Sequence, residues 1–255
     1  MSWPFWFTRS TFAPPRNRNW THLERTTIWL APVTLPAQIS AVTFDVGGTL
    51  IAPWPSVGEI YAAAAVKHGA KNVSAKILKE RFITAWRALE DFNHTRDEWA
   101  ALVDTTFQGL TERPPSQTFF PELFEHFGRP EAWRMFDDAL PALEALASRG
   151  VKLGAISNWD DRLRPLLRGL NLSRYFEAIL VSCEVGFPKP SHVIFDAAAE
   201  KLGLAPAAIL HVGDSVPQDV EGARGAGFHS LLVQRGVPSQ NGERISSLLE
   251  LCDTR

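Results

Sequence analysis

Short apolar runs alternate with helical patterns through most of this 255-residue sequence, and the runs end near glycines or small polar residues. The apolar runs, which predict strands, cover residues 39–44, 151–156, 178–181, 208–212 and 228–233. The stretches that predict helices close on or near a glycine and cover residues 138–149, 162–169, 191–203 and 216–225. Strands and helices that alternate in this way form a parallel sheet with helices on both faces, so the sequence predicts an α/β fold.

The long interval between the first two apolar runs has a different pattern. Ser56 and Glu59 have the spacing of a capping box at the start of a helix, and Ser74 can cap a second helix. Helices are predicted over residues 56–65, 74–92 and 97–110, and a short segment over 121–127. We therefore predict a helical cap domain inserted into a Rossmann-like core. The predicted boundaries are 54–136 for the cap, and 39–53 with 137–255 for the core.

Residues 1–38 are predicted to form an irregular N-terminal extension. They are rich in tryptophan and proline and show no sustained period of 2 or 3.6 residues. They contain Arg9, Arg16, Arg18 and Arg25 against Glu24 alone, which gives a faint likeness to an organellar targeting peptide. Composition alone is weak evidence for targeting, so a cytoplasmic location is the expectation.

Charge and composition limit the kinds of partner. A formal net charge of -2 and a pI near 6.4 give no electrostatic footprint for nucleic acid or for an anionic membrane surface. No apolar run reaches the roughly 18 to 20 residues that span a bilayer. Cys183 and Cys252 are not spaced for a zinc site or a disulfide framework. We expect a small-molecule substrate, and no pattern predicts the oligomeric state.

The first apolar run ends in Asp45, and the pair Gly47-Gly48 follows shortly after. Active sites of open α/β sheets lie at the carboxyl ends of parallel strands, so Asp45 is placed to act as a nucleophile. Gly47 has no side chain that could give or take a proton. The sequence therefore predicts a nucleophile without a proton-transfer group two residues away.

Four segments at the ends of predicted strands resemble the haloacid dehalogenase (HAD) superfamily of hydrolases, over most of residues 39–235. They are Phe44-Asp45-Val46-Gly47-Gly48-Thr49-Leu50, Ile156-Ser157-Asn158, Gly186-Phe187-Pro188-Lys189-Pro190, and Gly213-Asp214-Ser215 followed by Asp219. In that superfamily the aspartate of the first segment forms a covalent intermediate, and the second segment holds the phosphoryl group. The lysine neutralises the nucleophile and the substrate anion, and the acidic segment binds magnesium.

The resemblance implies a role for each matching residue. The implied catalytic residues are Asp45, Ser157 and Lys189; the phosphate-binding residues are Gly48, Thr49, Ser157, Asn158 and Lys189; and the Mg²⁺ ligands are Asp45, the Gly47 carbonyl, Asp214 and Asp219. Elementary electrostatics supports such a set. A carboxylate that attacks a phosphate dianion meets like charge, which a hard cation with oxygen ligands and a fixed ammonium offset.

Gly47 leaves three classes of function open, because phosphatases of the superfamily have a second aspartate at this position. The first class is a magnesium-dependent phosphoryl hydrolase that acts on a small phosphorylated molecule through an Asp45 intermediate. Its acid–base step would be weakened, so it would favour good leaving groups or borrow an acid from the cap. The second class is a carbon–halogen or carbon–phosphorus hydrolase, and the third is a catalytically silent protein that binds a ligand or partner. The candidates for a borrowed acid are His68, Glu90, Asp91 and His94.

Several side chains near these motifs have simpler interpretations. His211 lies inside a predicted strand and is expected to be a hydrogen-bonded core histidine. Cys183 is expected to be a small buried side chain. Asp160 is expected to cap the helix that follows it, and Arg162 and Arg164 are expected to be solvated.

Overall fold

The computed structural model describes residues 38–71, 73–89, 92–240 and 242–252, so nearly all of the predicted extension lies outside the described residues. Its largest element is a six-stranded sheet in the order β5-β4-β1-β6-β7-β8, in which every neighbouring pair is parallel. The strands are β1 (Ala41–Phe44), β4 (Lys152–Ser157), β5 (Ala178–Val181), β6 (Ile209–Gly213), β7 (His229–Val233) and β8 (Arg244–Ile245). The predicted α/β fold is confirmed, and only β8 is too short to give a strand pattern in the sequence.

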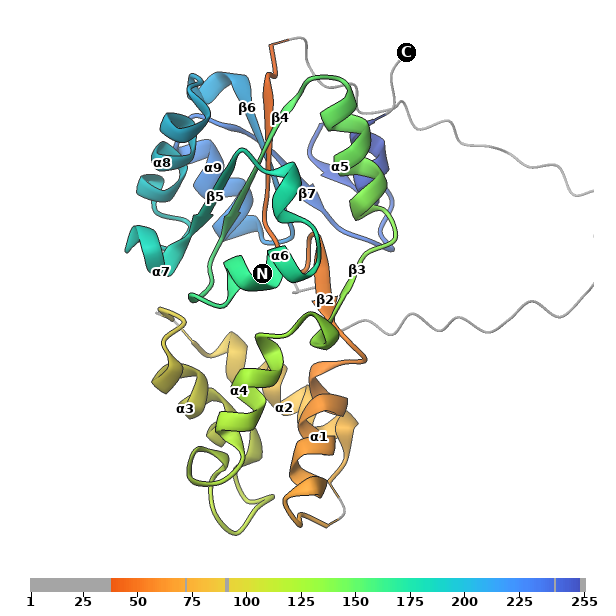
Figure 1. The fold of residues 1–255 in the computed structure, drawn as a ribbon, viewed down its shortest axis with the longest axis vertical. Coiled ribbons are helices and arrows are strands. Elements are labelled where there is room, and N and C mark those ends of the chain that lie inside the picture. Colours follow the sequence, from red (N-terminus) through yellow and green to blue (C-terminus); the bar gives the residue numbers. More distant parts are fainter. Residues whose placement is uncertain (1–37, 72, 90–91, 241, 253–255) are drawn as a thin grey trace, which may run out of the picture.

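Helices cover both faces of this sheet because its strands alternate their side chains between two apolar clusters. Val42 and Phe44 of β1 pack on one side with α5 (Ala139–Ser148) and α6 (Leu163–Gly169). Ala41 packs on the other side with α8 (His192–Leu202) and α9 (Gly222–Gly225), and Figure 1 shows these two groups of helices on opposite sides of the strands. The remaining short elements of the core are α7 (Ser182–Val185), the 3-10 helices η4 (Ser173–Tyr175), η5 (Pro206–Ala208) and η7 (Leu248–Leu251), and the π-helix η6 (Val216–Glu221).

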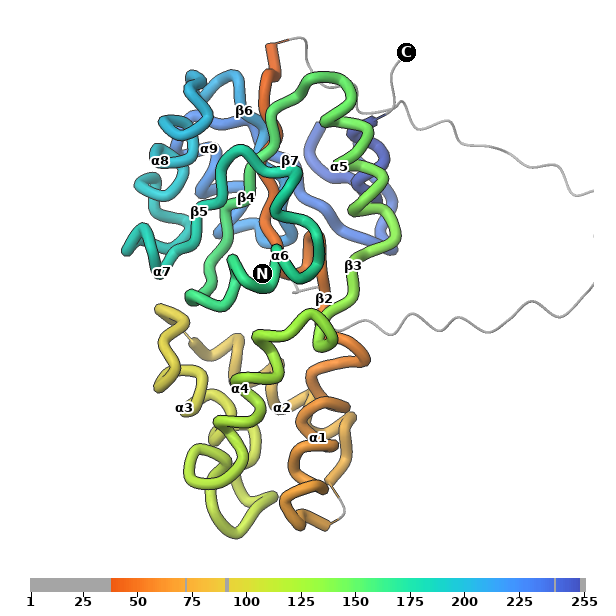
Figure 2. The backbone as a smooth tube through the Cα atoms, in the orientation of Figure 1, coloured from red at the N-terminus to blue at the C-terminus, as the bar shows by residue number. Residues whose placement is uncertain are grey.

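A second, smaller unit is attached to the core through an antiparallel two-stranded ribbon, β2 (Ile51–Pro53) and β3 (Trp133–Met135). The chain between these strands, which we call the cap, forms four α-helices in its described residues, and they have their own buried cluster. They are α1 (Val57–Lys67), α2 (Ala75–Arg87), α3 (Arg96–Phe107) and α4 (Phe120–Phe127), joined by the 3-10 helices η2 (Pro115–Gln117) and η3 (Pro130–Ala132). Figure 2 shows the cap chain leaving and rejoining the core at this ribbon.

The helix caps follow the sequence signals. Ser56 and Ser74 each accept a hydrogen bond from a backbone N–H in the first turn of α1 and α2. Thr95 forms a complete capping box with Glu98 at the start of α3, one residue before the predicted start of this helix at residue 97. The second cap helix ends at Arg87, earlier than the predicted end near Phe92.

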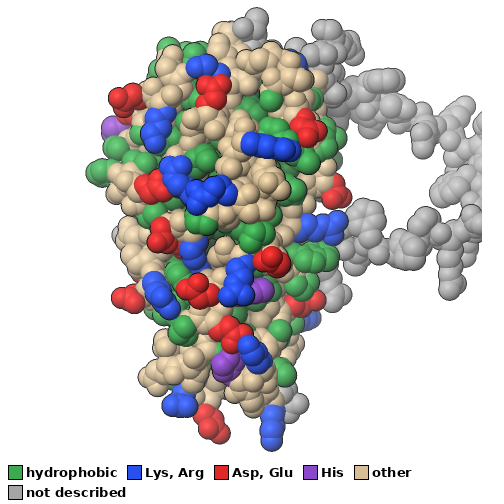
Figure 3. Space-filling model, viewed as in Figure 1, with side chains coloured by type: hydrophobic (Ala, Val, Ile, Leu, Met, Phe, Trp, Pro, Cys, Tyr) green, Lys and Arg blue, Asp and Glu red, His purple; other side chains and the backbone are tan. Residues whose placement is uncertain are grey.

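Strand register brings the polar strand ends to one edge of the sheet. Phe44, the last residue of β1, lies opposite Ala155 of β4 and Val212 of β6. The residues that follow in each strand therefore emerge at the same edge, which faces the cap in Figure 1. On the face drawn in Figure 3, cationic and anionic side chains are interspersed. Among the described residues, no helix is long and apolar enough to cross a membrane.

Candidate active site

Asp45 lies at the centre of a buried polar cluster at this edge. Its backbone N–H donates to the Val212 carbonyl at 2.9 Å, which continues the pairing of β1 with β6 and fixes where the side chain begins. Its Oδ1 accepts from the Ser157 hydroxyl at 3.0 Å and from the Lys189 ammonium at 2.8 Å. The other carboxylate oxygen, Oδ2, receives neither of these bonds, and Asp45 lines a cavity beneath the cap. Asp45 is therefore oriented with one oxygen held and the other available.

Lys189 is positioned by hydrogen bonds to its backbone as well as by ion pairs of its ammonium group. The Asn158 side chain accepts from the Lys189 N–H at 2.7 Å and donates to the Lys189 carbonyl at 2.9 Å. The Lys189 ammonium, which is almost fully buried, bridges Asp45 and Asp219, with a distance of 2.6 Å to Asp219 Oδ1. The Asn158 side chain is thus used to position Lys189, and only its backbone N–H is left to contact a ligand.

Asp219 lies in the π-helix η6 and is the most heavily bonded carboxylate of the cluster. Oδ1 meets Lys189 and the Nε2 of His211, the latter at 3.1 Å, and Oδ2 accepts from the Ser215 N–H at 2.9 Å. A side chain at Gly213 would place its Cβ 2.1 Å from the Asp219 carboxyl carbon, so this close approach requires a glycine. Because both oxygens are in use, Asp219 is placed to orient Lys189.

His211 completes the cluster from inside β6. Its Nδ1 lies 3.0 Å from the Thr43 hydroxyl while Nε2 meets Asp219, and the ring is fully buried. The expectation of a hydrogen-bonded core histidine is confirmed. Burial lowers the pKa of His211, although the Asp219 carboxylate acts to raise it.

The carboxylates differ in how firmly they hold their charge. Burial raises the pKa of Asp45 despite the charge of Lys189, and it raises that of Asp214 further, because Asp45 and Asp219 add like charge. Burial acts in the same direction on Asp219, but Lys189 and His211 outweigh it and hold the pKa of that carboxyl far below its usual range. Burial acts to lower the pKa of Lys189, and Asp219 and Asp45 more than offset it. The ammonium is thus fixed as a cation.

The chemistry of this donor set fits a divalent cation. Asp45, Asp214 and Asp219 each have a carboxylate oxygen within 4.8 Å of those of the other two, although both oxygens of Asp219 already accept hydrogen bonds. Hard oxygen donors are what Mg²⁺ prefers, and burial, with a further contribution from neighbouring carboxylates, raises the pKa values of Asp45 and Asp214. Gly47 also lines the cavity, and a glycine has only backbone atoms to offer a ligand.

Comparison with known proteins agrees with this geometry. A family model described as haloacid dehalogenase-like hydrolase matches residues 39–227. The chain belongs to the haloacid dehalogenase-like hydrolase family. The mouse (Mus musculus) haloacid dehalogenase-like hydrolase domain-containing protein 3 is 35% identical over 82% of this chain and 87% of its own length.

Two solved structures with a similar fold are named for different activities. A HAD phosphatase from Thermococcus onnurineus is 27% identical, with a TM-score of 0.61, over 83% of this chain and 95% of that one. A dehalogenase with an intermediate complex is 21% identical, with a TM-score of 0.65, over 86% of this chain and all of that one. The second likeness concerns the fold alone, so the reaction has to be argued from the residues of this HAD-like chain.

The structure does not bring Gly48 and Thr49 to the cavity. The Gly48 N–H donates to the Ile51 carbonyl at 2.8 Å, and Thr49 is fully buried with an unpartnered hydroxyl. Arg235 donates to the carbonyls of both residues and to Asp138, which fixes the loop after the nucleophile. No spacing in the sequence marks Arg235 for this role, since it lies far along the chain.

Two expectations near the site are wrong. Cys183 is exposed, because Ser182 takes the inward position at the start of α7 and bonds with the Trp159 backbone. Arg162 is mostly buried: it pairs with Asp160 at 2.6 Å, and its guanidinium lies 3.4 Å from the centre of the Phe124 ring. Burial against the cap explains why Arg162 needs a counter-ion.

Of the candidates for a borrowed acid, only His94 lines the cavity among those that the structure describes. His68 is exposed and pairs with Glu122, and Glu90 and Asp91 lie outside the described residues. His94 is 7% exposed and has a φ of 63°, an uncommon backbone conformation for a residue with a side chain. The cavity also contains aromatic residues of α2 and α3, such as Trp86 and Trp99, that no sequence motif singled out.

Proposed function

We propose that this protein is a magnesium-dependent phosphoryl hydrolase that acts on a small phosphorylated molecule through a covalent intermediate on Asp45. The observation that supports the proposal is the Asp45 carboxylate, which lines the cavity and whose Oδ1 accepts hydrogen bonds from Lys189 and Ser157. Asp214 lies beside the Asp45 carboxylate. Position 47 is a glycine, which has no side chain that can exchange protons.

In the first step, Oδ2 of Asp45 attacks phosphorus, and the bond between phosphorus and the leaving oxygen breaks with its electron pair on that oxygen. Ser157 and the Asn158 N–H would hold the phosphoryl oxygens, and Lys189 would offset the like charge of nucleophile and substrate. A magnesium ion bound by Asp45, Asp214 and the Gly47 carbonyl would neutralise further charge on the phosphoryl group. In the second step, water attacks phosphorus, Asp45 is released, and inorganic phosphate forms.

Gly47 determines which substrates this chemistry favours. A positioned general acid contributes about 10² to 10⁴ in rate, and nothing at position 47 supplies it. The leaving oxygen therefore departs as an anion that takes its proton from solvent. Acyl and aryl phosphates, whose leaving groups are stable anions, are expected to react much faster than alkyl phosphates.

The test is a phosphate-release assay on the full chain with Mg²⁺, using acetyl phosphate, phenyl phosphate and methyl phosphate. We expect turnover of the first two, and its loss in Asp45→Asn. Activity that persists in Asp45→Asn would disprove the nucleophile. A wild-type protein that turns over none of the three substrates, but gains activity in Gly47→Asp, would instead identify a catalytically silent binding protein.

A further inference from the structure

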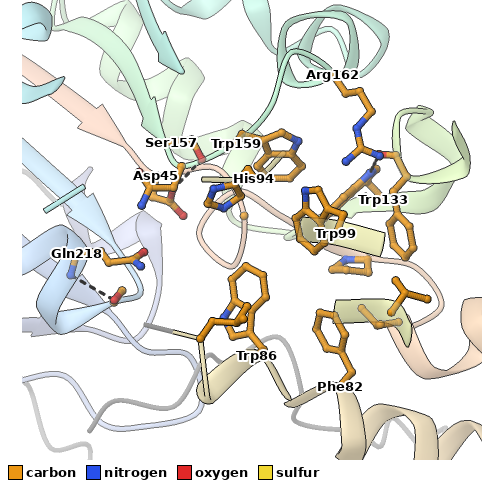
Figure 4. Close-up of a pocket in the computed structure, with 18 of the residues that line it drawn as sticks. Asp45, Phe82, Trp86, His94, Trp99, Trp133, Ser157, Trp159, Arg162 and Gln218 are labelled. Atoms are coloured by element: carbon orange, nitrogen blue, oxygen red, sulfur yellow. Dashed lines mark hydrogen bonds between the residues drawn. The ribbon is translucent and has the colours of Figure 1, made fainter. Parts of the chain in front are cut away.

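The cavity above Asp45 has a cap wall made mainly of aromatic rings. Its volume is about 410 Å³, which lies within the roughly 300 to 1,000 Å³ typical of small-molecule pockets. In Figure 4, Asp45 and Ser157 lie at one end of the cavity, and the rings of Trp86, Trp99 and Phe82 lie toward the other. The aromatic residues of the wall are Tyr61, Phe82, Trp86, Trp99, Phe120, Phe124, Phe127 and Trp133.

The rings nearest His94 form one ordered cluster. Trp86 and Trp99 are stacked, with centroids 5.5 Å apart and planes inclined by 23°. Phe92 meets Trp99 edge-on at 4.9 Å and the His94 ring at 4.7 Å. Contacts between aromatic rings in these geometries add stabilisation beyond the burial of apolar area. The wall therefore presents flat ring surfaces in fixed positions.

Two polar atoms in this wall are buried without a hydrogen-bond partner among the residues that the structure describes. They are the Nε1 of Trp99 and the Nδ1 of His94, and both residues line the cavity. Buried polar atoms are nearly always hydrogen-bonded, because an unpaired one costs roughly 1 to 3 kcal/mol. Trp99 Nε1 is a donor only, so its natural partner is a hydrogen-bond acceptor on a bound molecule.

Both arginines that line the cavity already interact with other groups of the protein. The charge of Arg162 is matched by Asp160, and its guanidinium is covered by Phe124. Arg87, the other arginine that lines the cavity, is also engaged within the protein. Burial lowers the pKa of His94 to about 4, so the ring is neutral near pH 7. The wall therefore suits a flat, uncharged group with a polar edge.

We propose that the cap pocket binds the aromatic leaving group of an aryl phosphate, with an acceptor on the ring bonded to Trp99 Nε1. The proposal rests on the proposed function, which places the phosphoryl group at Asp45. It also matches the absence of an acid at position 47. A phenol has a pKa of about 10, so an aryl oxide leaves without being protonated in the same step.

Calorimetric titration of Asp45→Asn with Mg²⁺ tests the pocket without turnover. The probes are methyl phosphate, 2-naphthyl phosphate and 4-methylumbelliferyl phosphate, whose bicyclic ring carries a carbonyl acceptor. We expect 2-naphthyl phosphate to bind at least about tenfold more tightly than methyl phosphate, because its ring is removed from water. The umbelliferyl probe should bind about two- to tenfold more tightly than the naphthyl probe, through one further hydrogen bond.

A second substitution, made in the Asp45→Asn protein, separates the contribution of the Trp99 hydrogen bond to binding from that of the aromatic contacts. Trp99→Phe keeps an aromatic side chain and removes the N–H, so it should abolish the preference for the umbelliferyl over the naphthyl probe. Trp54→Phe is the matched control, because Trp54 is 50% exposed, does not line the cavity, and packs under Arg134. The control should retain the preference.

The outcomes distinguish this proposal from the proposed function. Equal affinity for naphthyl and methyl phosphate would overturn the aromatic pocket, even if the wild-type protein hydrolyses acetyl phosphate. A preference that survives Trp99→Phe would overturn the assigned hydrogen bond. Tight binding of the aryl probes by a protein that hydrolyses none of the substrates would support the pocket and refute the hydrolase.

Discussion

Replacing His94 by asparagine should make the protein less sensitive to acid. His94 is held neutral in an apolar pocket, where burial lowers its pKa from 6.5 to about 4. The unfolded chain binds the proton more readily than the folded one between these two values. The free energy of unfolding contributed by this group therefore falls as the pH decreases from about 6.5 to 4, and is unaffected above that window.

The size of the effect follows from the two pKa values. At pH 5, protonation of the unfolded but not the folded imidazole favours unfolding by about 2 kcal/mol relative to pH 8, and the full difference below pH 4 is about 3 kcal/mol. Asparagine removes the titrating group and tolerates the φ of 63° at this position better than most residues. The buried carboxylates near Asp45 titrate in both proteins, so their contribution cancels in the comparison.

The assay is urea unfolding of wild type and His94→Asn at pH 8 and pH 5, followed by tryptophan fluorescence. Trp86 and Trp99 pack around His94 with centroids 6.2 and 5.9 Å away, so part of the fluorescence signal comes from the rings next to His94. His229→Asn, which removes an exposed histidine of the core, controls for the substitution. An identical loss of stability from pH 8 to pH 5 in wild type and His94→Asn would refute the assignment of a neutral, buried His94.

Three further substitutions test the candidate site. Gly47→Asp should raise the rate of methyl phosphate hydrolysis by about 10² or more and change acetyl phosphate hydrolysis far less, because only the alkyl leaving group needs an acid. Gly47→Asn is the control without an acid. An equal gain in rate in both variants would contradict this reasoning. Lys189→Met should abolish phosphate release. It should also lower the free energy of unfolding of the metal-free protein by about 3 kcal/mol, because Asp45 and Asp219 lose their buried partner. A urea denaturation midpoint equal to that of wild type would contradict this structural role of Lys189. Gly213→Ala should lower the free energy of unfolding by about 1 to 3 kcal/mol, because its Cβ overlaps Asp219, and unchanged urea unfolding would show that Asp219 moves without cost.

The parallel core could be predicted because its pattern is local. A run such as 178–181 matches β5 at both ends, and β1, β4, β6 and β7 differ from their predicted bounds by one or two residues. Buried strands have continuous apolar sequences and glycines near their ends, so each is visible without knowledge of the others. The ribbon of β2 and β3 was not predicted, because its strands have three residues each and pair across the whole cap.

Candidate site residues at strand ends were also accessible from the sequence. Asp45, Ser157 and Asp214 follow or end predicted strands, and parallel strands bring their carboxyl ends to one edge. The sequence did not show that Thr49 is buried away from the cavity, because the conformation of the loop after Asp45 determines its orientation. It also did not show that both oxygens of Asp219 are taken by neighbours.

The sequence alone determined the fold class, the position of Asp45 at a strand end, and the loss of a proton-transfer side chain at position 47. These three features depend on residue type and on the order of neighbouring residues, which can be read from the sequence without knowledge of the tertiary packing. Tertiary structure alone decided that Lys189 bridges two carboxylates, that Arg162 is buried, and that the cap presents aromatic rings with an unpartnered Trp99 N–H to the cavity. Those facts depend on contacts between residues far apart in the chain, and no local pattern encodes which side chains meet there.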